Sequence, residues 1–332
     1  MLTTGDQQAL LAWYDHHQRD LPWRRTRDPW SILLSEVLLQ QTQVSRGLVY
    51  WRRMIETFPT VASMSQASVD AVLKAWEGAG YYSRARRLHA LSQRVMLTEE
   101  NDGFNGQLPE TYAELLSLPG IGPYTAAAVA SIAFEQPVAC VDGNIRRVMA
   151  RHTAQTEPAA KDVQVWADAS LQIDRPGDWN QALMELGATV CTPRRVRCEA
   201  CPLAPSCQGV AAPERYPAPK KLRKIDVELS VVVELALDGY PVLSQRPMSG
   251  MFAGLWGPQY AEGAIEHDPS TTFCGTLRHE LSHRRFTVHV HRRTNVERST
   301  GTSPDSVALS ALDSKVLELA TVTTDELSLI HI

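Results

Sequence analysis

Hydrophobic residues recur at helical spacing through the first two thirds of the chain. In segments 31–44 (SILLSEVLLQQTQV), 67–78, 124–134 and 178–190, apolar side chains stand three or four positions apart, and Gly and Pro residues lie between the segments. No alternating pattern of comparable strength occurs before residue 211. We therefore expect residues 1–210 to form an all-α domain.

The pattern changes after residues 211–224, which are rich in Pro, Ala and Lys and which we predict to be a linker. Beyond them, segments 227–237, 241–246 and 285–293 contain many β-branched residues and alternate apolar with polar side chains. Such alternation is typical of strands with one buried face. The sequence therefore predicts a multi-domain protein whose second domain, at residues 225–332, is α+β.

The composition is that of a globular protein. The chain has 332 residues, 44% of them hydrophobic, and a formal net charge of -4, which argues against a uniformly basic nucleic-acid binder. Eight Lys and Arg residues nevertheless lie between positions 194 and 224, which indicates either a local contact with an anionic partner or a solvated surface. The N-terminal residues lack the pattern of a secretory signal, and nowhere do eighteen apolar residues stand in succession. We expect a cytoplasmic protein without a membrane partner.

Four of the six cysteines lie within seventeen residues. Cys191, Cys198, Cys201 and Cys207 are separated by six, two and five residues. In a reducing compartment, thiolates at such short spacing are typical of a metal centre rather than of disulfides. Structural zinc sites usually contain two Cys-x-x-Cys pairs, and only Cys198 and Cys201 are spaced in this way. The spacing therefore favours a 4Fe-4S cluster and leaves zinc as the alternative.

Three further features of the helical part carry candidate chemistry. Gly120 and Gly122, between two helical segments, permit a tight turn whose backbone N–H groups can bind phosphate; the alternative is an ordinary helix connection. Asp142 precedes another amphipathic helix, where it is either a functional carboxylate or an N-cap. Glu36 stands among apolar residues, where burial would raise its pKa as a general acid requires; the alternative is an exposed helix face.

Taken in order, Glu36, the turn at 118–122, Asp142 and the four cysteines resemble the endonuclease III superfamily of helix-hairpin-helix DNA glycosylases. Within this superfamily, the strings at 19–24 (RDLPWR), 35–44 (SEVLLQQTQV) and 80–84 (GYYSR) resemble the MutY branch, the adenine DNA glycosylases. Bifunctional relatives place a lysine nucleophile at the position of Tyr124, so the resemblance implies a monofunctional enzyme. A glycosylase with AP lyase activity is the alternative.

The resemblance implies base excision repair by a monomeric, nucleoid-associated enzyme that flips adenine, mispaired with 8-oxoguanine or guanine, out of double-stranded DNA. It assigns Glu36 as the acid that protonates N7 of adenine. It assigns Asp142 as the carboxylate that stabilises the oxocarbenium-like sugar, directly or as a covalent intermediate, before water completes hydrolysis. Tyr124 and Asn144 support this pair. The DNA contacts that the resemblance assigns are Arg19, Trp23, Arg24 and Glu185 around the adenine, Gln41 and Tyr81 as wedges beside the lesion, and Gly120 and Gly122 in the hairpin.

One C-terminal motif fits two classes of protein. Residues 279–283 (HELSH) match H-E-x-x-H, the zinc site of metallopeptidases, but that site requires a helix, and a strand pattern begins directly after it. In the adenine glycosylase branch, 281–283 instead resemble a Phe-Ser-His loop that recognises 8-oxoguanine. That resemblance assigns Ser282 and His283 to the lesion, with Leu281 in place of the aromatic residue.

Residues 250–256 (GMFAGLW) resemble the opening of a Nudix-like domain, but the acidic Nudix catalytic box is missing from the residues after Trp256. We therefore expect the second domain to recognise the lesion rather than to hydrolyse nucleotides. A DNA-binding protein that has lost catalysis is a third hypothesis. Binding alone would require neither Glu36 nor Asp142, so the presence of both argues against it.

Overall fold

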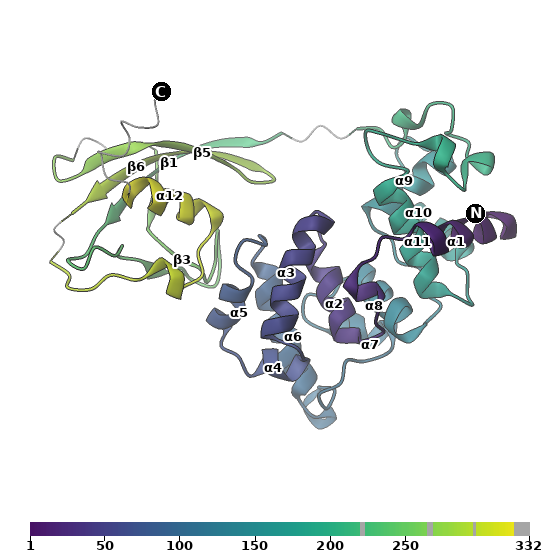
Figure 1. The fold of residues 1–332 in the computed structure, drawn as a ribbon, viewed down its shortest axis with the longest axis horizontal. Coiled ribbons are helices and arrows are strands. Elements are labelled where there is room, and N and C mark those ends of the chain that lie inside the picture. Colours follow the sequence, from purple (N-terminus) through teal and green to yellow (C-terminus); the bar gives the residue numbers. More distant parts are fainter. Residues whose placement is uncertain (220–222, 264–267, 295–296, 322–332) are drawn as a thin grey trace. The chain divides into compact units, whose positions relative to one another are not determined.

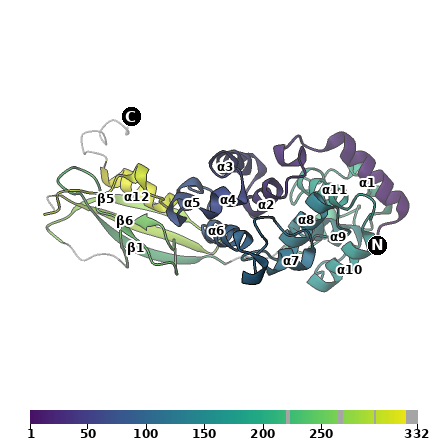
Figure 2. The ribbon, with the colours of Figure 1, turned by 90° about the horizontal axis from the view of Figure 1, so that it is seen from below.

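Two compact units make up the chain. The computed structural model describes residues 1–219, 223–263, 268–294 and 297–321, drawn in Figures 1 and 2. The first unit comprises Met1–Gln66 and Arg87–Lys220, and the second comprises Ala67–Arg86 and Lys221–Ile332. The division at Lys220 falls within the stretch 211–224 that we predict to be a linker, of which residues 220–222 lie outside the described residues. The second unit also contains a segment from the helical part of the sequence.

Helices form the first unit, as the apolar spacing predicts (Figure 1). Amphipathic α9, for example, buries Ile145, Val148 and Met149. The elements are α1 (Thr4–His17), η1 (Pro22–Arg24), α2 (Pro29–Leu38), α3 (Val44–Thr57), α4 (Val61–Ser65), α6 (Ser83–Met96, whose first four residues belong to the second unit), η2 (Glu99–Asn101), α7 (Tyr112–Ser117), α8 (Pro123–Phe134), α9 (Gly143–His152), α10 (Ala160–Ser170), α11 (Pro176–Thr189), η3 (Cys198–Ala200), η4 (Ala204–Ser206) and η5 (Pro213–Arg215).

Helix α2 is buried along almost its whole length. Asp28 caps it by accepting a hydrogen bond from the backbone N–H of Ser31, and Pro29 occupies the first turn, where a missing N–H costs nothing. The helix ends at Leu38, so the helix predicted over 31–44 is too long. Gln41 has a φ of 59°, a left-handed conformation that cannot continue a right-handed helix. The second half of the predicted segment is therefore a break before α3.

The predicted helix-hairpin-helix is formed by α7 and α8. Gly120 has a φ of 80°, and a Cβ there would lie 2.6 Å from Cβ of Arg87, so both conformation and packing require glycine. Gly122 is the N-cap of α8, and a Cβ at this position would meet no atom within 4 Å. The turn therefore has no room for a side chain at Gly120, whereas the space beside Gly122 is empty of atoms of the described residues.

A mixed four-stranded sheet is the centre of the second unit, in the order β4-β1-β6-β5. β1 runs parallel to β6, whereas β4 and β5 are antiparallel to their neighbours. A two-stranded sheet pairs β2 with β3. The elements are α5 (Val69–Ala75), β1 (Ile225–Glu234), β2 (Ser244–Gln245), β3 (Trp256–Gly257), β4 (Tyr260–Glu262), β5 (Thr272–Glu280), β6 (Arg284–Arg293), η6 (Pro304–Ser306) and α12 (Ala311–Thr321).

One face of the four-stranded sheet forms a hydrophobic core with α12. Phe286, Val288 and Val290 of β6 are buried, and the residues between them are not, as period-two alternation requires. Leu312 and Val316 of α12 belong to the same core. Helix α12 packs against β5 and β6 (Figures 1 and 2). A mixed sheet covered by one helix agrees with the predicted α+β class.

Residues 67–86 belong to the second unit because their side chains bond to its backbone. Oε1 of Glu77 accepts a hydrogen bond from the N–H of Leu309 (2.9 Å), and Oη of Tyr82 donates to the carbonyl of Leu309 (2.8 Å). Nζ of Lys74 donates to the carbonyl of Val307 (2.9 Å). The end of α5 and the turn between α5 and α6 thus hold the strip of chain that precedes α12.

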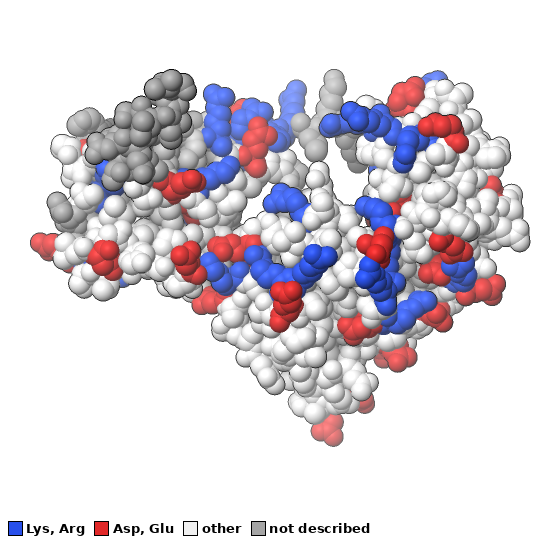
Figure 3. All heavy atoms as spheres, viewed as in Figure 1, with Lys and Arg blue, Asp and Glu red and all other residues white. Residues whose placement is uncertain are grey.

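Charge is mixed over the surface. Acidic and basic side chains are interspersed on the face drawn in Figure 3, consistent with a net charge of -4. Some are paired within one unit, as are Arg175 and Asp15, whose nearest atoms are 2.6 Å apart. In the part of the chain that the structure describes, every helix is too short or too polar to cross a bilayer.

Candidate active site

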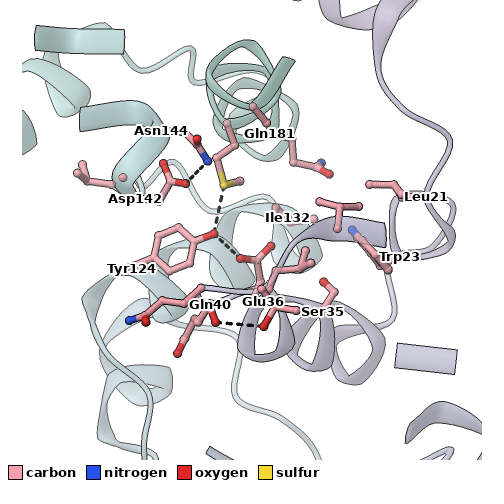
Figure 4. A pocket seen from close by; sticks show the side chains of 18 of the residues that line it. Leu21, Trp23, Ser35, Glu36, Gln40, Tyr124, Ile132, Asp142, Asn144 and Gln181 are labelled. Carbon is pink, nitrogen blue, oxygen red and sulfur yellow. Dashed lines mark hydrogen bonds between the residues drawn. The ribbon is translucent and has the colours of Figure 1, made fainter. Parts of the chain in front are cut away.

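A cavity of about 770 Å³ in the helical unit collects the four predicted catalytic residues and four of the predicted DNA contacts (Figure 4). Its walls come from the N-terminal segment 19–24, from α2 and the break after it, and from α8, α9, α10 and α11. The predicted residues that line it are Arg19, Trp23, Arg24, Glu36, Gln41, Tyr124, Asp142 and Asn144. Helices far apart in sequence thus bring two carboxyl groups to one cavity.

Glu36 is buried, with 7% of its surface exposed, so the alternative of an exposed helix face is wrong. Burial raises the pKa of Glu36 to about 7; a hydrogen bond from Tyr124 opposes this rise, and the charge of Asp142 adds to it. A carboxyl with this pKa is protonated in a large fraction of molecules at neutral pH. It can therefore donate a proton to a bound base.

Tyr124 lies in the first turn of α8, and its side chain points towards Glu36 (Figure 4). Its Oη donates a hydrogen bond to Oε2 of Glu36 at 2.5 Å and lies 3.2 Å from Sδ of Met184. Burial, together with the charge of Glu36, raises the pKa of Tyr124 well above its ordinary value. The phenol therefore stays protonated and acts as a donor. Among the described residues that line the cavity, none is a lysine.

Asp142 is an N-cap and also a cavity residue. Its Oδ1 accepts a hydrogen bond from the N–H of Ile145 (2.7 Å), as the capping interpretation predicts, and its Oδ2 accepts one from Nδ2 of Asn144 (2.7 Å). Burial raises the pKa of Asp142, and these hydrogen bonds and the charge of Arg147 oppose the rise. Both bonds favour the ionised form of Asp142, whereas at Glu36 burial outweighs the bond from Tyr124.

Hydrogen bonds link Asp142 to the cysteine segment. Beyond Asn144, the chain of bonds continues from Nη2 of Arg147 to Oδ1 of Asn144 (2.8 Å) and from Nε of Arg147 to the carbonyl of Cys191 (2.8 Å). At Gly187 a Cβ would lie 2.5 Å from Cβ of Asn144, so only glycine permits this approach of α11 to α9. The position of the carboxylate therefore depends on the backbone of the first cysteine.

Glu185 does not line the cavity, in contrast to the prediction. It is fully buried, and its two oxygens accept hydrogen bonds from Nε of Arg19 (2.6 Å) and Nη2 of Arg24 (2.8 Å). Burial acts to raise the pKa of Glu185, but the two guanidinium groups outweigh it and hold the pKa below its ordinary value. A buried charge requires partners, so Glu185 holds the lining arginines in place from behind.

Trp23 lines the cavity, as predicted, and so does Gln41, which is predicted as a wedge beside the lesion. Trp23 is buried, and its ring centroid is 5.6 Å from that of Trp51. Gln41 is exposed and has a left-handed backbone conformation, which is uncommon outside glycine and occurs often at ligand-binding sites. The break after α2 thus presents Gln41 to solvent at the edge of the cavity.

Sequence reasoning missed most residues of the wall, and four of them on α9 and α11 show why. Gln181, Met184 and Ala188 line it from one face of α11, at spacings of three and four residues. The same spacing describes the apolar face of any packed helix, so it does not indicate a cavity. Arg146, on α9, is the fourth; its position four residues after Asp142 was the available signal.

The predicted lesion-recognition residues lie in the second unit. Tyr81 has 46% of its surface exposed and, like Gln41, a positive φ (48°). The hydroxyls of Tyr81 and Ser282 are hydrogen-bonded to each other. Ser282 and His283 are both exposed, in the hairpin turn between β5 and β6. Within this unit the structure therefore brings Tyr81 to the hairpin that carries Ser282 and His283.

The metallopeptidase motif does not have the geometry that its chemistry requires. His279 and Glu280 are the last residues of β5, and His283 precedes β6. The H-E-x-x-H zinc site needs a helix that puts both histidines on one face. The strand pattern predicted at this position is confirmed, and the peptidase hypothesis is wrong.

The four clustered cysteines are free thiols grouped at the end of the helical unit. Cys198, Cys201 and Cys207 each interact electrostatically with Cys191. Burial raises the pKa of Cys201 to about 11, a hydrogen bond from the backbone of Leu203 opposes this rise, and the three neighbouring thiols add to it. Among the described residues, no three His, Cys, Asp or Glu side chains are arranged to hold a metal ion. The donor set itself, four thiols with one Cys-x-x-Cys pair, has the chemistry of an iron-sulfur or zinc ligand set.

Comparison with known proteins identifies relatives of this chain. Residues 34–167 match the family of HhH-GPD superfamily base excision DNA repair proteins. The chain is 44% identical over 219 residues to the adenine DNA glycosylase of Homo sapiens, in an alignment that covers 62% of this chain and 39% of that protein. It is 32% identical over 317 residues to the adenine DNA glycosylase of Schizosaccharomyces pombe, covering 75% of this chain and 68% of that protein. The chain thus spans about two fifths of the human relative and two thirds of the yeast one.

Solved structures of similar fold include a thermostable thymine-DNA glycosylase, with a TM-score of 0.56, 28% identity and coverage of 62% of this chain and 94% of that one. A non-covalent endonuclease III–DNA complex has a TM-score of 0.53 at 23% identity, covering 64% of this chain and 98% of that one. The second likeness concerns the fold alone. Together they agree with the helix-hairpin-helix fold of the first unit.

Proposed function

The chain belongs to the adenine DNA glycosylase family, and we propose that it hydrolyses the N-glycosidic bond of adenine mispaired with 8-oxoguanine or guanine in double-stranded DNA. The observation that carries the proposal is the pair formed by Glu36 and Asp142 in one cavity. The two carboxyls differ in their hydrogen bonds, and Glu36 has a pKa of about 7. An acid and a carboxylate at one site are what departure of a base and stabilisation of a sugar cation require.

In the proposed reaction, the flipped adenine enters the cavity and accepts the proton of Glu36 at N7. The bond between C1′ and N9 then breaks, and its electron pair leaves with the protonated base. Asp142 stabilises the positive charge that develops on the sugar, and water completes the hydrolysis at C1′. Tyr124 orients Glu36, and Asn144 orients Asp142. Because no described lysine lines the cavity, a Schiff-base lyase step has no support there.

We propose that the second unit is a Nudix-like lesion-recognition domain. Its support is the turn between β5 and β6, which exposes Ser282 and His283, together with the bond from Ser282 to Tyr81. His283→Ala is expected to lower the preference for adenine opposite 8-oxoguanine over adenine opposite guanine. An unchanged ratio of the two rates would count against this role.

We propose that Cys191, Cys198, Cys201 and Cys207 hold a 4Fe-4S cluster. The chemistry that such a cluster supplies here is structural, because hydrolysis of a glycosidic bond transfers no electron. Purified protein should be brown and contain iron and acid-labile sulfide in equal amounts, and Cys201→Ser should lose both. Zinc without sulfide would establish the other metal that the spacing allows.

The experiment that tests the function is a base-release assay on a duplex with one adenine opposite 8-oxoguanine, with and without alkali after the reaction. We expect strand breakage only after alkali, the result for a monofunctional glycosylase. Glu36→Gln should abolish release while retaining binding to the mispair. Release at the wild-type rate in this variant would refute the acid assignment, and breakage without alkali would indicate a lyase.

A further inference from the structure

Four arginines line the cavity, and three of them are committed to protein acceptors. Arg19 and Arg24 pair with buried Glu185. Arg147 donates to the side chain of Asn144 and to three backbone carbonyls. In the described part of the chain, Arg146 is the one cavity arginine whose side chain makes no ion pair or hydrogen bond with the protein.

Arg146 is also not the counter-ion of the cavity carboxyls. The cation that acts on Glu36 is Arg24, and the cation that acts on Asp142 is Arg147. A half-buried guanidinium that neither compensates these acids nor bonds to the backbone has its donors available to a ligand.

The surface around Arg146 is open. Gly143 precedes it by three positions in α9, and residues three apart lie on the same face of a helix. A Cβ at Gly143 would meet no atom within 4 Å. The protein therefore leaves this face of α9 uncovered next to the cavity, beside the first turn that Asp142 caps.

We propose that Arg146 binds a backbone phosphate of the nucleotide whose base occupies the cavity. The inference rests on the proposed function, since it assigns to Arg146 an anion carried by the same substrate. A guanidinium suits a phosphate because it donates two parallel N–H bonds to it. A nucleotide that brings its phosphate towards the carboxylate of Asp142 meets electrostatic repulsion, which a nearby arginine offsets.

The test measures the salt dependence of DNA binding in a Glu36→Gln background, so that the duplex stays intact. The probes are a duplex with adenine opposite 8-oxoguanine and a fully paired duplex of otherwise identical sequence. Each phosphate contact contributes roughly 0.9 to the slope of log K against log salt concentration. Arg146→Gln should lower the slope by about this amount on the mispaired duplex and leave it unchanged on the paired one. Arg146→Lys, which retains the positive charge, should keep most of the slope.

Arg175→Gln is the matched control, since it removes the same charge from an arginine that is already paired with Asp15 and Asp178. Its slope should equal that of the parent. An unchanged slope in Arg146→Gln, an equal loss in both variants, or an equal loss on both duplexes would overturn the inference. If the slope changes as expected but the chain with Glu36 releases no adenine, the phosphate contact stands and the proposed glycosylase function fails.

Discussion

Oη of Tyr124 donates a hydrogen bond to Oε2 of Glu36 at 2.5 Å, which joins the first turn of α8 to the centre of α2. The phenol oxygen takes no proton from Glu36, because the pKa of Tyr124 is raised and its hydroxyl keeps its hydrogen. The bond favours the ionised carboxylate and so opposes the effect of burial. Burial and the charge of Asp142 raise the pKa of Glu36, the Tyr124 bond and Arg24 lower it, and the result of about 7 lies in the range useful to a general acid.

The pH dependence of base release should follow Glu36. The group acts when protonated, and its pKa is about 7. The single-turnover rate should therefore be high below pH 7 and fall by about tenfold for each pH unit above it. A rate measured under single-turnover conditions between pH 5 and 9 checks this, with DNA binding measured at each pH as the control. A rate that does not decline by pH 9 would contradict the assignment.

Tyr124→Phe should move that decline to higher pH. The substitution removes a hydrogen bond that lowers the pKa of Glu36 and keeps the ring in place. Burial then acts without this opposition, so Glu36 stays protonated to higher pH. The same pH series on the variant measures the shift. Asp142 acts in the opposite sense, because its charge raises the pKa of Glu36; a decline that moves to lower pH in Tyr124→Phe would mean that the phenol does not stabilise the carboxylate.

Much of this site could be predicted from the sequence, because the residues next to each of its groups in the chain distinguish it. Glu36 interrupts an apolar run, Asp142 precedes a helix, and the hairpin has its two glycines. The spacing of apolar residues could not predict that α2 ends at Leu38. The apolar spacing continues through Leu39 to Val44, and only the left-handed conformation of Gln41 breaks it. A backbone conformation that tertiary contacts impose has no pattern in the sequence.

The partners of buried groups could not be predicted either. Residues 67–78 show a helical pattern, which indicates that one face is covered but not which part of the chain covers it. Their inclusion in the second unit depends on the bonds of Glu77 and Tyr82 to Leu309, more than 200 residues away. Glu185 is predicted at the cavity, and the structure places it behind the arginines, because a fully buried carboxylate is stable only beside cations.

Glu36→Gln should stabilise the fold at alkaline pH. The folded-state pKa of about 7 lies above the ordinary 4.5. The stability that protonated Glu36 contributes is therefore complete below pH 4.5 and is lost as pH rises through 7. A neutral glutamine avoids this loss, so the variant should gain about 2 kcal/mol relative to wild type between pH 5 and pH 8. Urea unfolding at both pH values measures it, with Glu228→Gln on the exposed face of β1 as the control. Equal pH dependence in wild type and Glu36→Gln would show that Glu36 is not buried in its charged form.

Arg147→Gln should slow base release more than it weakens DNA binding. Arg147 connects Oδ1 of Asn144 to the carbonyl of Cys191, and Asn144 in turn bonds to Asp142. Loss of the guanidinium frees the Asn144 amide to turn, so the carboxylate loses a donor and its position becomes less defined. Because this affects the sugar cation rather than the bound duplex, the single-turnover rate should fall by about tenfold to a hundredfold, with the dissociation constant for the mispair changed much less. Arg147→Lys keeps a positive charge near Asp142 but cannot reach both acceptors. This variant therefore tests the effect of the charge without the two hydrogen bonds. If the lysine variant releases adenine at the wild-type rate, the charge of Arg147 suffices and the hydrogen-bonded connection to the cysteine segment has no part in placing Asp142.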